Sequence, residues 1–185
     1  VPIGEARLAD GTVEIEGTAE ALSDTLRSPY ENAECLAYSY AKKRKERERN
    51  EDGEHETKWR TLDSGGESVP FSVVDDTGSI PVDPAAATLG LDTAYSSRSG
   101  DIKRTESRID PGDGVHVIGQ KRAPVEAAAD LGDARAYIGD GDEAPTFRVT
   151  TGGELETVAR MFGRSLGSVA LGAVPLVAVT ATELG

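Results

Sequence analysis

Short segments in which polar and apolar residues alternate recur as far as residue 151, and this pattern most constrains the fold. In Thr12–Thr18, Val13 and Ile15 share one side of an extended chain while Glu14 and Glu16 share the other, which is typical of a half-buried strand. Strands repeated in this way, with Gly, Pro and Asp between them, predict a mainly β protein built as an antiparallel barrel or sandwich. The further expected strands are 35–41, 57–62, 69–74, 80–82, 115–118, 136–138 and 146–150.

The charge and the metal-binding residues exclude several classes of protein. With one cysteine and two histidines, the 185-residue chain cannot form an internal disulfide or supply the ligands of a zinc finger or a RING domain. The net charge of −13 argues against general binding of nucleic acid, because an acidic surface repels phosphates. It favours a halophilic protein whose carboxylates are screened by salt, with an ordinary acidic soluble domain as the alternative.

A strongly basic run and a serine-rich stretch interrupt the strand pattern. Lys42–Arg49 reads KKRKERER and is followed by acidic residues, so we expect a solvated tip on a long hairpin that joins the strands of Tyr38 and Trp59. The alternative interpretation is a basic finger that touches anionic lipid or nucleic acid. The stretch Ala85–Ser107 contains few large apolar residues and is predicted to be a loop excursion.

The C-terminal residues predict a helix that leads into a membrane. Thr151 and Glu154 have the spacing of a helix capping box, and residues 165–182 carry no charge. As a helix this segment is roughly 27 Å long, close to the ~30 Å hydrocarbon layer. The alternative is a helix buried in the domain. We therefore expect a domain at 1–151 and a transmembrane helix within 152–185, with a hydrophobic segment before Val1 and a continuation beyond Gly185 in the parent sequence.

A series of residues in the predicted β region resembles the GIDE domain, also called the beside-a-membrane domain, of the mitochondrial E3 ubiquitin ligase family and its prokaryotic relatives. The resemblance covers roughly residues 17–151. Each motif residue also has a structural interpretation as a turn or core residue. The residues that carry it are Gly17, Ser28, Pro29, Cys35, Tyr38, Trp59, Pro70, Phe71, Asp75, Gly78, Pro84, Pro111, Gly112, Asp113 and Gly119.

The resemblance implies a small OB-like β-barrel held beside a bilayer, in a prokaryotic and specifically haloarchaeal member without a RING. Ubiquitin transfer in the eukaryotic ligases belongs to that separate RING. The sequence predicts no catalytic residue, no metal site and no cofactor. The acidic loop Gly139–Glu143 has the oxygen atoms for weak Ca²⁺ binding, but a plain hairpin turn explains it as well.

Cys35 is interpreted as a small buried hydrophobic residue, and as a nucleophile only if a histidine lies beside it. His116 alternates with Val115 and Val117, so it is expected to point outward from its strand.

The leading hypothesis is a non-enzymatic β-barrel module at the cell membrane, with a protein partner and with lipid contacted by the C-terminal helix. The alternative is an OB-like nucleic-acid binder that uses Lys42–Arg49, with Tyr38, Tyr40 and Trp59 as stacking platforms.

Overall fold

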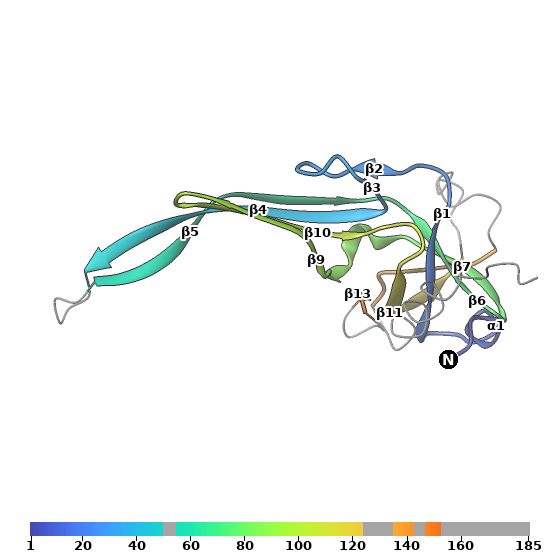
Figure 1. The fold of residues 1–185 in the computed structure, drawn as a ribbon. Coiled ribbons are helices and arrows are strands. Elements are labelled where there is room, and N and C mark those ends of the chain that lie inside the picture. Colours follow the sequence, from blue (N-terminus) through green and yellow to red (C-terminus); the bar gives the residue numbers. More distant parts are fainter. Residues whose placement is uncertain (50–54, 124–134, 143–146, 153–185) are drawn as a thin grey trace, which may run out of the picture.

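The computed structural model describes residues 1–49, 55–123, 135–142 and 147–152, which form a barrel and a long β arm that extends from it (Figure 1). Both are built almost entirely from strands, which confirms the predicted mainly β class. The elements are α1 (Ile3–Ala6), β1 (Thr12–Ala21), β2 (Leu26–Arg27), β3 (Glu34–Cys35), β4 (Ala37–Arg49), β5 (His55–Ser68), β6 (Phe71–Asp75), β7 (Gly78–Val82), η1 (Pro84–Ala86), β8 (Thr88–Gly90), β9 (Thr93–Ser99), β10 (Ile102–Ile109), β11 (Gly114–Arg122), β12 (Tyr137–Gly139) and β13 (Arg148–Thr151).

Five strands close the barrel, in the order β1-β6-β7-β12-β11, because β1 also pairs with β11. Val13 lies opposite Gly119 in the β1–β11 pair, and Ala19 lies opposite Val73 in the β1–β6 pair. Strands β13 and β8 extend the sheet beyond β11. The closure confirms the predicted barrel.

The prediction of a wholly antiparallel sheet is wrong at two pairings. Strand β12 runs parallel to β7, where Ile138 lies opposite Val82, and β13 runs parallel to β8. Parallel neighbours need a crossover connection, and here that connection contains the second hairpin of the arm and β11. No local sequence signal marks such a pairing.

The core lies inside the barrel and follows the predicted alternation. Val13 and Ile15 of β1 are buried, as are Val115 and Val117 of β11. The short helix α1 was not predicted and adds two further side chains to this core. The buried cluster comprises Ile3, Ala6, Val13, Ile15, Ala19, Leu36, Ala37, Phe71, Val73, Ile80, Val82, Ile109, Val115, Val117, Ile138, Phe147 and Val149.

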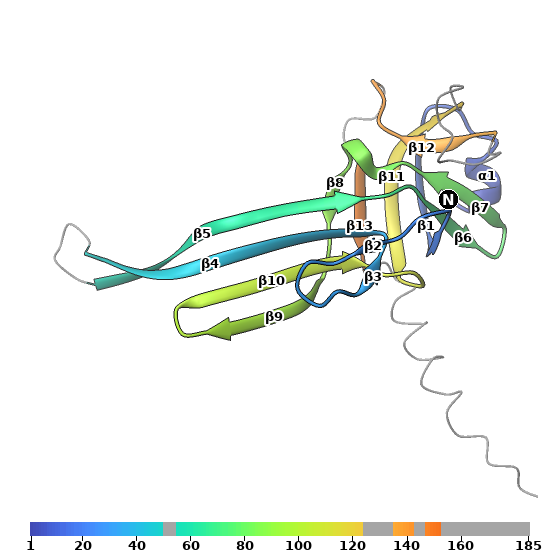
Figure 2. The same ribbon diagram turned by 90° about the horizontal axis from the view of Figure 1, so that it is seen from above.

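The arm is a four-stranded antiparallel sheet in the order β5-β4-β10-β9, made of two hairpins inserted into the barrel sequence. Along the chain, hairpin β4–β5 is inserted between β1 and β6, and hairpin β9–β10 between β7 and β11. Figure 2 shows the two hairpins projecting together from the barrel. Strand β4 has 13 residues, which corresponds to roughly 40 Å of extended chain. The arm is therefore long relative to the barrel that carries it.

Two predictions about this region are wrong. Lys42–Arg49 is part of strand β4 rather than the tip of the hairpin, and the connecting residues 50–54 lie outside the described residues. Ala85–Ser107 is not a loop excursion, because it contains β8, β9 and most of β10. Gly100, with φ of 58°, and Asp101 form a two-residue turn between Ser99 and Ile102, a common turn for a tight hairpin.

The predicted C-terminal transmembrane helix falls on residues 153–185, outside the described residues. Within the residues that the structure describes, no helix has the length and apolar character needed to cross a membrane. Thr151, the predicted helix cap, ends β13, and its hydroxyl accepts a hydrogen bond from the Asp92 amide at 2.7 Å.

Candidate binding surface on the arm

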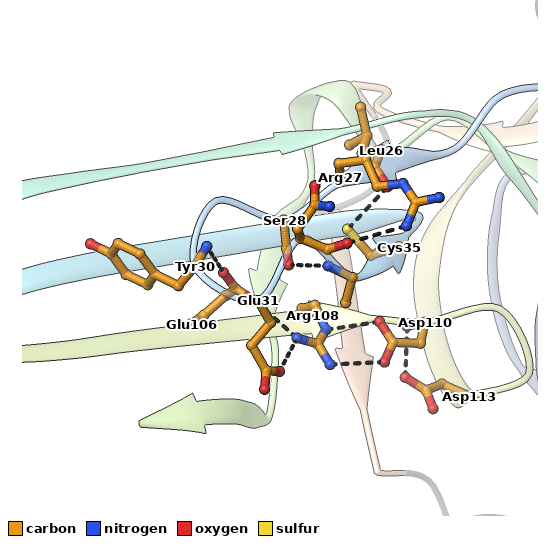
Figure 3. Close-up of polar contacts among 12 residues, drawn as sticks. Leu26, Arg27, Ser28, Tyr30, Glu31, Cys35, Glu106, Arg108, Asp110 and Asp113 are labelled. Carbon is orange, nitrogen blue, oxygen red and sulfur yellow. Dashed lines mark hydrogen bonds and ion pairs between the residues drawn. The ribbon is translucent and has the colours of Figure 1, made fainter. Parts of the chain in front are cut away.

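A buried ion pair lies where the arm joins the barrel (Figure 3). Glu106 of β10 is fully buried, and the Arg108 guanidinium, two residues further along the same strand, lies 2.9 Å from its Oε1. Arg108 also donates to Asp110 at 3.0 Å and to Glu31 at 2.6 Å. One arginine thus contacts three carboxylates, and of these only the charge of Glu106 is cut off from water.

The β2–β3 segment is fastened to the arm through the same network. The Tyr30 amide donates to Glu106 Oε2 at 2.7 Å, and the Ser28 side chain bonds to Glu106 as well. The Ser28 hydroxyl oxygen also accepts a hydrogen bond from the Ala33 amide at 3.1 Å, which fixes the turn between β2 and β3. Glu106 therefore acts as a hydrogen-bond acceptor that joins β10 to a segment far away in the sequence.

The turn Pro111-Gly112-Asp113 connects the arm to the barrel. Asp113 Oδ2 accepts a hydrogen bond from the Asp110 amide at 2.8 Å. The Gly112 amide donates to the Ala19 carbonyl at 2.7 Å, and the Ala19 amide donates to the Asp113 carbonyl at 2.8 Å. Strand β10 of the arm therefore passes into β11 of the barrel through a turn that is bonded to β1.

The electrostatics of this network favour the charged forms. Burial opposes ionisation of Glu106, but hydrogen bonds from the Tyr30 amide, Ser28 and Arg108 keep the pKa of its carboxyl below the usual value. Burial likewise opposes the charge of Arg108, while its bonds to Glu31, Asp110 and Glu106 raise its pKa. The network is structural: it gives the arm a fixed attachment.

One face of the arm, which we call the tyrosine face, carries Tyr38, Tyr40 and Tyr95 with Tyr30 packed on them. The Tyr30 and Tyr40 rings lie 5.7 Å apart at 79°, and the Tyr30 and Tyr95 rings lie 6.2 Å apart. Edge-to-face aromatic pairs of this kind stabilise their contact beyond the area that they bury. The β2–β3 segment thus covers the base of this face.

Further out, the tyrosine face carries compensated charges. Lys58 lies within 3.4 Å of both Glu48 and Glu56, and Arg60 lies 3.7 Å from Glu46. Cross-strand compensation between β4 and β5 was expected for this region and is confirmed.

The opposite face of the arm, which we call the basic face, has a different composition. Side chains alternate between the two faces of a strand, so the odd-numbered residues of β4 lie opposite to Tyr38 and Tyr40. The register places Lys103 of β10 beside Lys43 and Arg98 of β9 beside Lys103. The basic face is defined by Lys43, Lys45, Arg47, Arg98, Lys103 and Trp59.

Trp59 lies on the basic face, with 39% of its surface exposed, and the Arg98 guanidinium carbon lies 5.3 Å from its ring centroid. Its cross-strand neighbour on β4 is Lys45. Of the three residues suggested as stacking platforms, Tyr38 and Tyr40 therefore lie on one face of the arm and Trp59 lies on the other, so they do not form a continuous surface. The sequence separation alone could not show this, since a register irregularity between Lys42 and Lys43 changes the alternation of β5.

Most of the remaining motif residues occupy the core, the turns and the strand crossings. A Cβ added to Gly17 would lie 2.5 Å from the Val74 carbonyl oxygen, and one added to Gly119 would lie 2.6 Å from Ile138. Phe71 is buried, and Gly112 has φ of 99° in its turn. Of the others, Gly78 begins β7, Pro84 is buried at the start of η1, Pro70 precedes β6, and Pro29 and Pro111 are exposed in turns.

The Asp75 carboxylate, at the end of β6, accepts hydrogen bonds from the β6–β7 turn and from the start of α1. Its Oδ1 accepts bonds from the Thr77 amide at 2.7 Å and the Gly78 amide at 3.0 Å, and its Oδ2 accepts one from the Ile3 amide at 2.9 Å. Burial opposes ionisation, but these donors lower the pKa of the carboxyl below its usual value. Asp75 therefore fixes the β6–β7 turn and attaches α1 to it.

Cys35 is fully buried, as the sequence predicts, and has the properties of an unreactive thiol. Its Sγ lies 3.9 Å from the Leu26 carbonyl oxygen, and burial, followed by the charge of Asp110, raises its pKa to about 11. His116 points outward to Glu14, with 2.8 Å between Nε2 and Oε1, which confirms its expected orientation. Among the described side chains the sulfur contacts a carbonyl oxygen and not a histidine, so the structure does not support the hydrolytic hypothesis.

The described residues contain no group of three or more His, Cys, Asp or Glu side chains placed to hold a metal ion. Glu143, the last residue of the acidic loop Gly139–Glu143, lies outside them.

The buried Glu106–Arg108 pair was missed by the sequence interpretation. Ile102–Ile109 has six consecutive polar residues between its two isoleucines, so no period in the sequence marks Glu106 or Arg108 as buried.

The barrel with its inserted arm defines the molecule as a β module from which a long sheet projects. Residues 41–106 match the model of the GIDE family, which is described as an E3 ubiquitin ligase. The match covers most of the arm together with β6 and β7, and less than half of the chain; it supports the resemblance to the GIDE domain. No curated protein and no solved structure matches the chain.

Proposed function

We propose that this chain is a GIDE-type module held at the cell membrane, in which the barrel fixes the arm as a binding surface for a protein partner. The arm is the observation that carries this proposal. Its outer part contributes no residue to the buried core, yet Glu106 and Arg108 attach its base firmly to the barrel. A long sheet with two solvated faces exposes much backbone and side chain and adds little hydrophobic stability, which is consistent with a role in binding.

The same proposal gives the module no reaction of its own. The single cysteine is buried with a raised pKa, and one cysteine with two histidines cannot supply the zinc ligands of a RING. Any ubiquitin-transfer step associated with the family would therefore reside in another protein or domain. We further propose that the protein is prokaryotic and haloarchaeal, which its charge of −13 supports.

The membrane tether is tested with the full chain expressed in cells and fractionated. The uncharged segment 165–182 should keep the protein in the membrane pellet after an alkaline carbonate wash. The double variant Leu171→Arg with Val174→Arg should move it to the supernatant, because each arginine costs roughly 3 kcal/mol at the centre of a membrane helix. The control adds arginines at two exposed positions, Leu8→Arg with Leu62→Arg, and should stay in the pellet. Release of the unmodified chain by the wash would contradict the tether.

The partner is tested by photo-crosslinking in native membranes. A crosslinking residue at exposed Ser99 at the end of β9 should give protein adducts, whereas one at exposed Asp76 on the barrel should not give the same adducts. Adducts that are identical at both positions would contradict the assignment of partner binding to the arm.

A further inference from the structure

The two faces of the arm differ in charge although the same strands form both. On the tyrosine face, Lys58 and Arg60 each have carboxylate partners. Among the residues that the structure describes, no acidic residue lies opposite Lys43, Lys45 or Lys103 in the register of the basic face, whereas the tyrosine face carries Glu46, Glu48, Glu56 and Asp63 among its cations. The acidic residue nearest to them in the register is Asp101, in the β9–β10 turn. A local positive field therefore persists on a chain whose net charge is −13.

The shape and composition of the basic face define the kind of partner. Between its cations lie small side chains such as Ala41, Thr61 and Thr105, so the face is a flat sheet surface on which long cationic side chains stand. Lys43, Lys45 and Lys103 are half-buried, as is typical of lysines that bury their apolar stems and keep the ammonium group in water. A partly exposed indole among the cations, here Trp59, is the residue type enriched at the boundary between lipid and water.

From this geometry we infer that the basic face binds the headgroups of anionic lipids, so that the arm lies along a negatively charged bilayer. The inference extends the proposed membrane location, on which it rests, by naming the surface and the lipid chemistry. Charge complementarity carries it, because basic residues near an anionic bilayer each strengthen binding about fivefold.

A single-stranded nucleic acid is the less favoured occupant. Stacking platforms need ring faces open to successive bases, and the basic face offers one tryptophan whose ring is already covered by Arg98. A long polyanion would also approach the strongly acidic remainder of the chain.

The experiment uses the fluorescence of Trp59, the chain's single tryptophan, in the full-length protein. Vesicles of phosphatidylglycerol and phosphatidylcholine at low ionic strength should shift its emission to shorter wavelength and protect it from iodide quenching. Vesicles of phosphatidylcholine alone should leave the emission unchanged, and about 1 M salt should reverse the effect because the screening length then falls to about 3 Å.

Two matched variants remove the same charge from alternate positions of one strand. Lys43→Gln with Lys45→Gln, on the basic face, should weaken the emission response to anionic vesicles by roughly thirtyfold in lipid concentration. Lys42→Gln with Arg44→Gln, on the tyrosine face, should change it less than threefold. Circular dichroism of both variants confirms that each is folded.

The outcomes separate this inference from the proposed tether. If the protein binds phosphatidylcholine vesicles through segment 165–182 and the emission of Trp59 does not change, the tether alone is supported. If the protein does not bind these vesicles, the tether fails, but the response of Trp59 to anionic vesicles still tests the basic face. No response of Trp59 to anionic vesicles, or equal loss in both variants, would overturn the inference. Binding of a labelled 20-nucleotide single strand that displaces the vesicles and depends on the same lysines would replace lipid by nucleic acid.

Discussion

Glu106 and Arg108 face the same side of β10, and their side chains meet 2.9 Å apart in a place where Glu106 has no contact with solvent. A buried carboxylate is tolerated only with a partner and a full set of donors, and here Tyr30, Ser28 and Arg108 supply them. This pair therefore determines whether the β2–β3 segment and the arm hold their positions.

Loss of Arg108 should be among the most damaging single changes. Arg108→Met leaves Glu106 buried without its cation, and we expect a loss of about 3–5 kcal/mol in the free energy of unfolding. Arg60→Met removes an arginine that is 71% exposed and 3.7 Å from Glu46, and should cost less than about 1 kcal/mol. Urea denaturation of both variants measures the difference. Adding Glu106→Gln to Arg108→Met should restore part of the loss, and equal costs for the two single variants would refute the structural role of the pair.

The stability of the β6–β7 turn should depend on pH through Asp75. Its pKa is lowered in the folded state, so its contribution is fully present above the unfolded pKa of about 4 and is lost progressively as the pH falls from there through the lower folded pKa. Asp75→Asn should reduce stability by about 1–3 kcal/mol at pH 7 and by much less near pH 3. Urea denaturation at the two pH values tests this, with the exposed neighbour Asp76→Asn as the control. A cost of Asp75→Asn that is the same at both pH values would contradict the assignment.

Gly17 should not accept a larger side chain. In Gly17→Ala the new methyl group would lie 2.5 Å from the Val74 carbonyl oxygen, a backbone atom, and 2.8 Å from Val73 Cγ1. Because the closed β1–β6 pair must then separate, we expect a loss of about 2–3 kcal/mol. Gly100→Asn is the control, since Gly100 has no atom within 4 Å of an added Cβ and asparagine tolerates its φ of 58°. Thermal unfolding that shifts equally in both variants would contradict this explanation.

Cys35 should react slowly in the folded protein. At pH 8 a thiol whose pKa is about 11 is almost entirely protonated, and burial also blocks access. Alkylation by iodoacetamide, followed by mass spectrometry, should be at least ~100-fold slower in the native protein than in urea. Rapid labelling under native conditions would reveal an activated thiol and reopen the nucleophile hypothesis.

Shortening the arm should leave the barrel stable. Replacing residues 46–58 by Asn-Gly closes the hairpin at the Lys45–Trp59 pair and removes none of the core residues. The melting temperature should change by only a few degrees, because mostly exposed ion pairs are lost. Circular dichroism at increasing temperature measures it. Failure of this variant to fold would show that the outer arm supports the barrel rather than presenting a surface.

The sequence pattern was sufficient to predict the strands of the barrel, but it did not predict hairpin β9–β10 of the arm. Val13 with Ile15 and Val115 with Val117 alternate with polar residues because only one side of a barrel strand is buried. Strand β9 is mostly exposed and Tyr95 is its one large aromatic side chain, so Thr93–Ser99 has no apolar period, and the sequence predicted a loop there. A strand that is polar on both faces is recognisable only once its partner is known.

The sequence indicated the charge of the candidate surface but not which residues share a face of the arm. Lys42–Arg49 was identified as a solvated, charged segment, yet only the register with β5 and β10 assigns alternate residues to opposite faces. The Glu106 site was not predictable, because Ser28 and Tyr30 reach it through tertiary folding and buried polar residues have no period of their own.

The closure of the barrel also sets an order of events during synthesis. Hairpin β4–β5 joins neighbouring segments and can pair once residue 68 has left the ribosome, whereas β7 obtains its partner β12 only after residue 139 has been made. Pairings between distant segments are slow to form because a long loop must first be closed. During synthesis, hairpin β4–β5 can therefore form before the barrel from which it projects is closed.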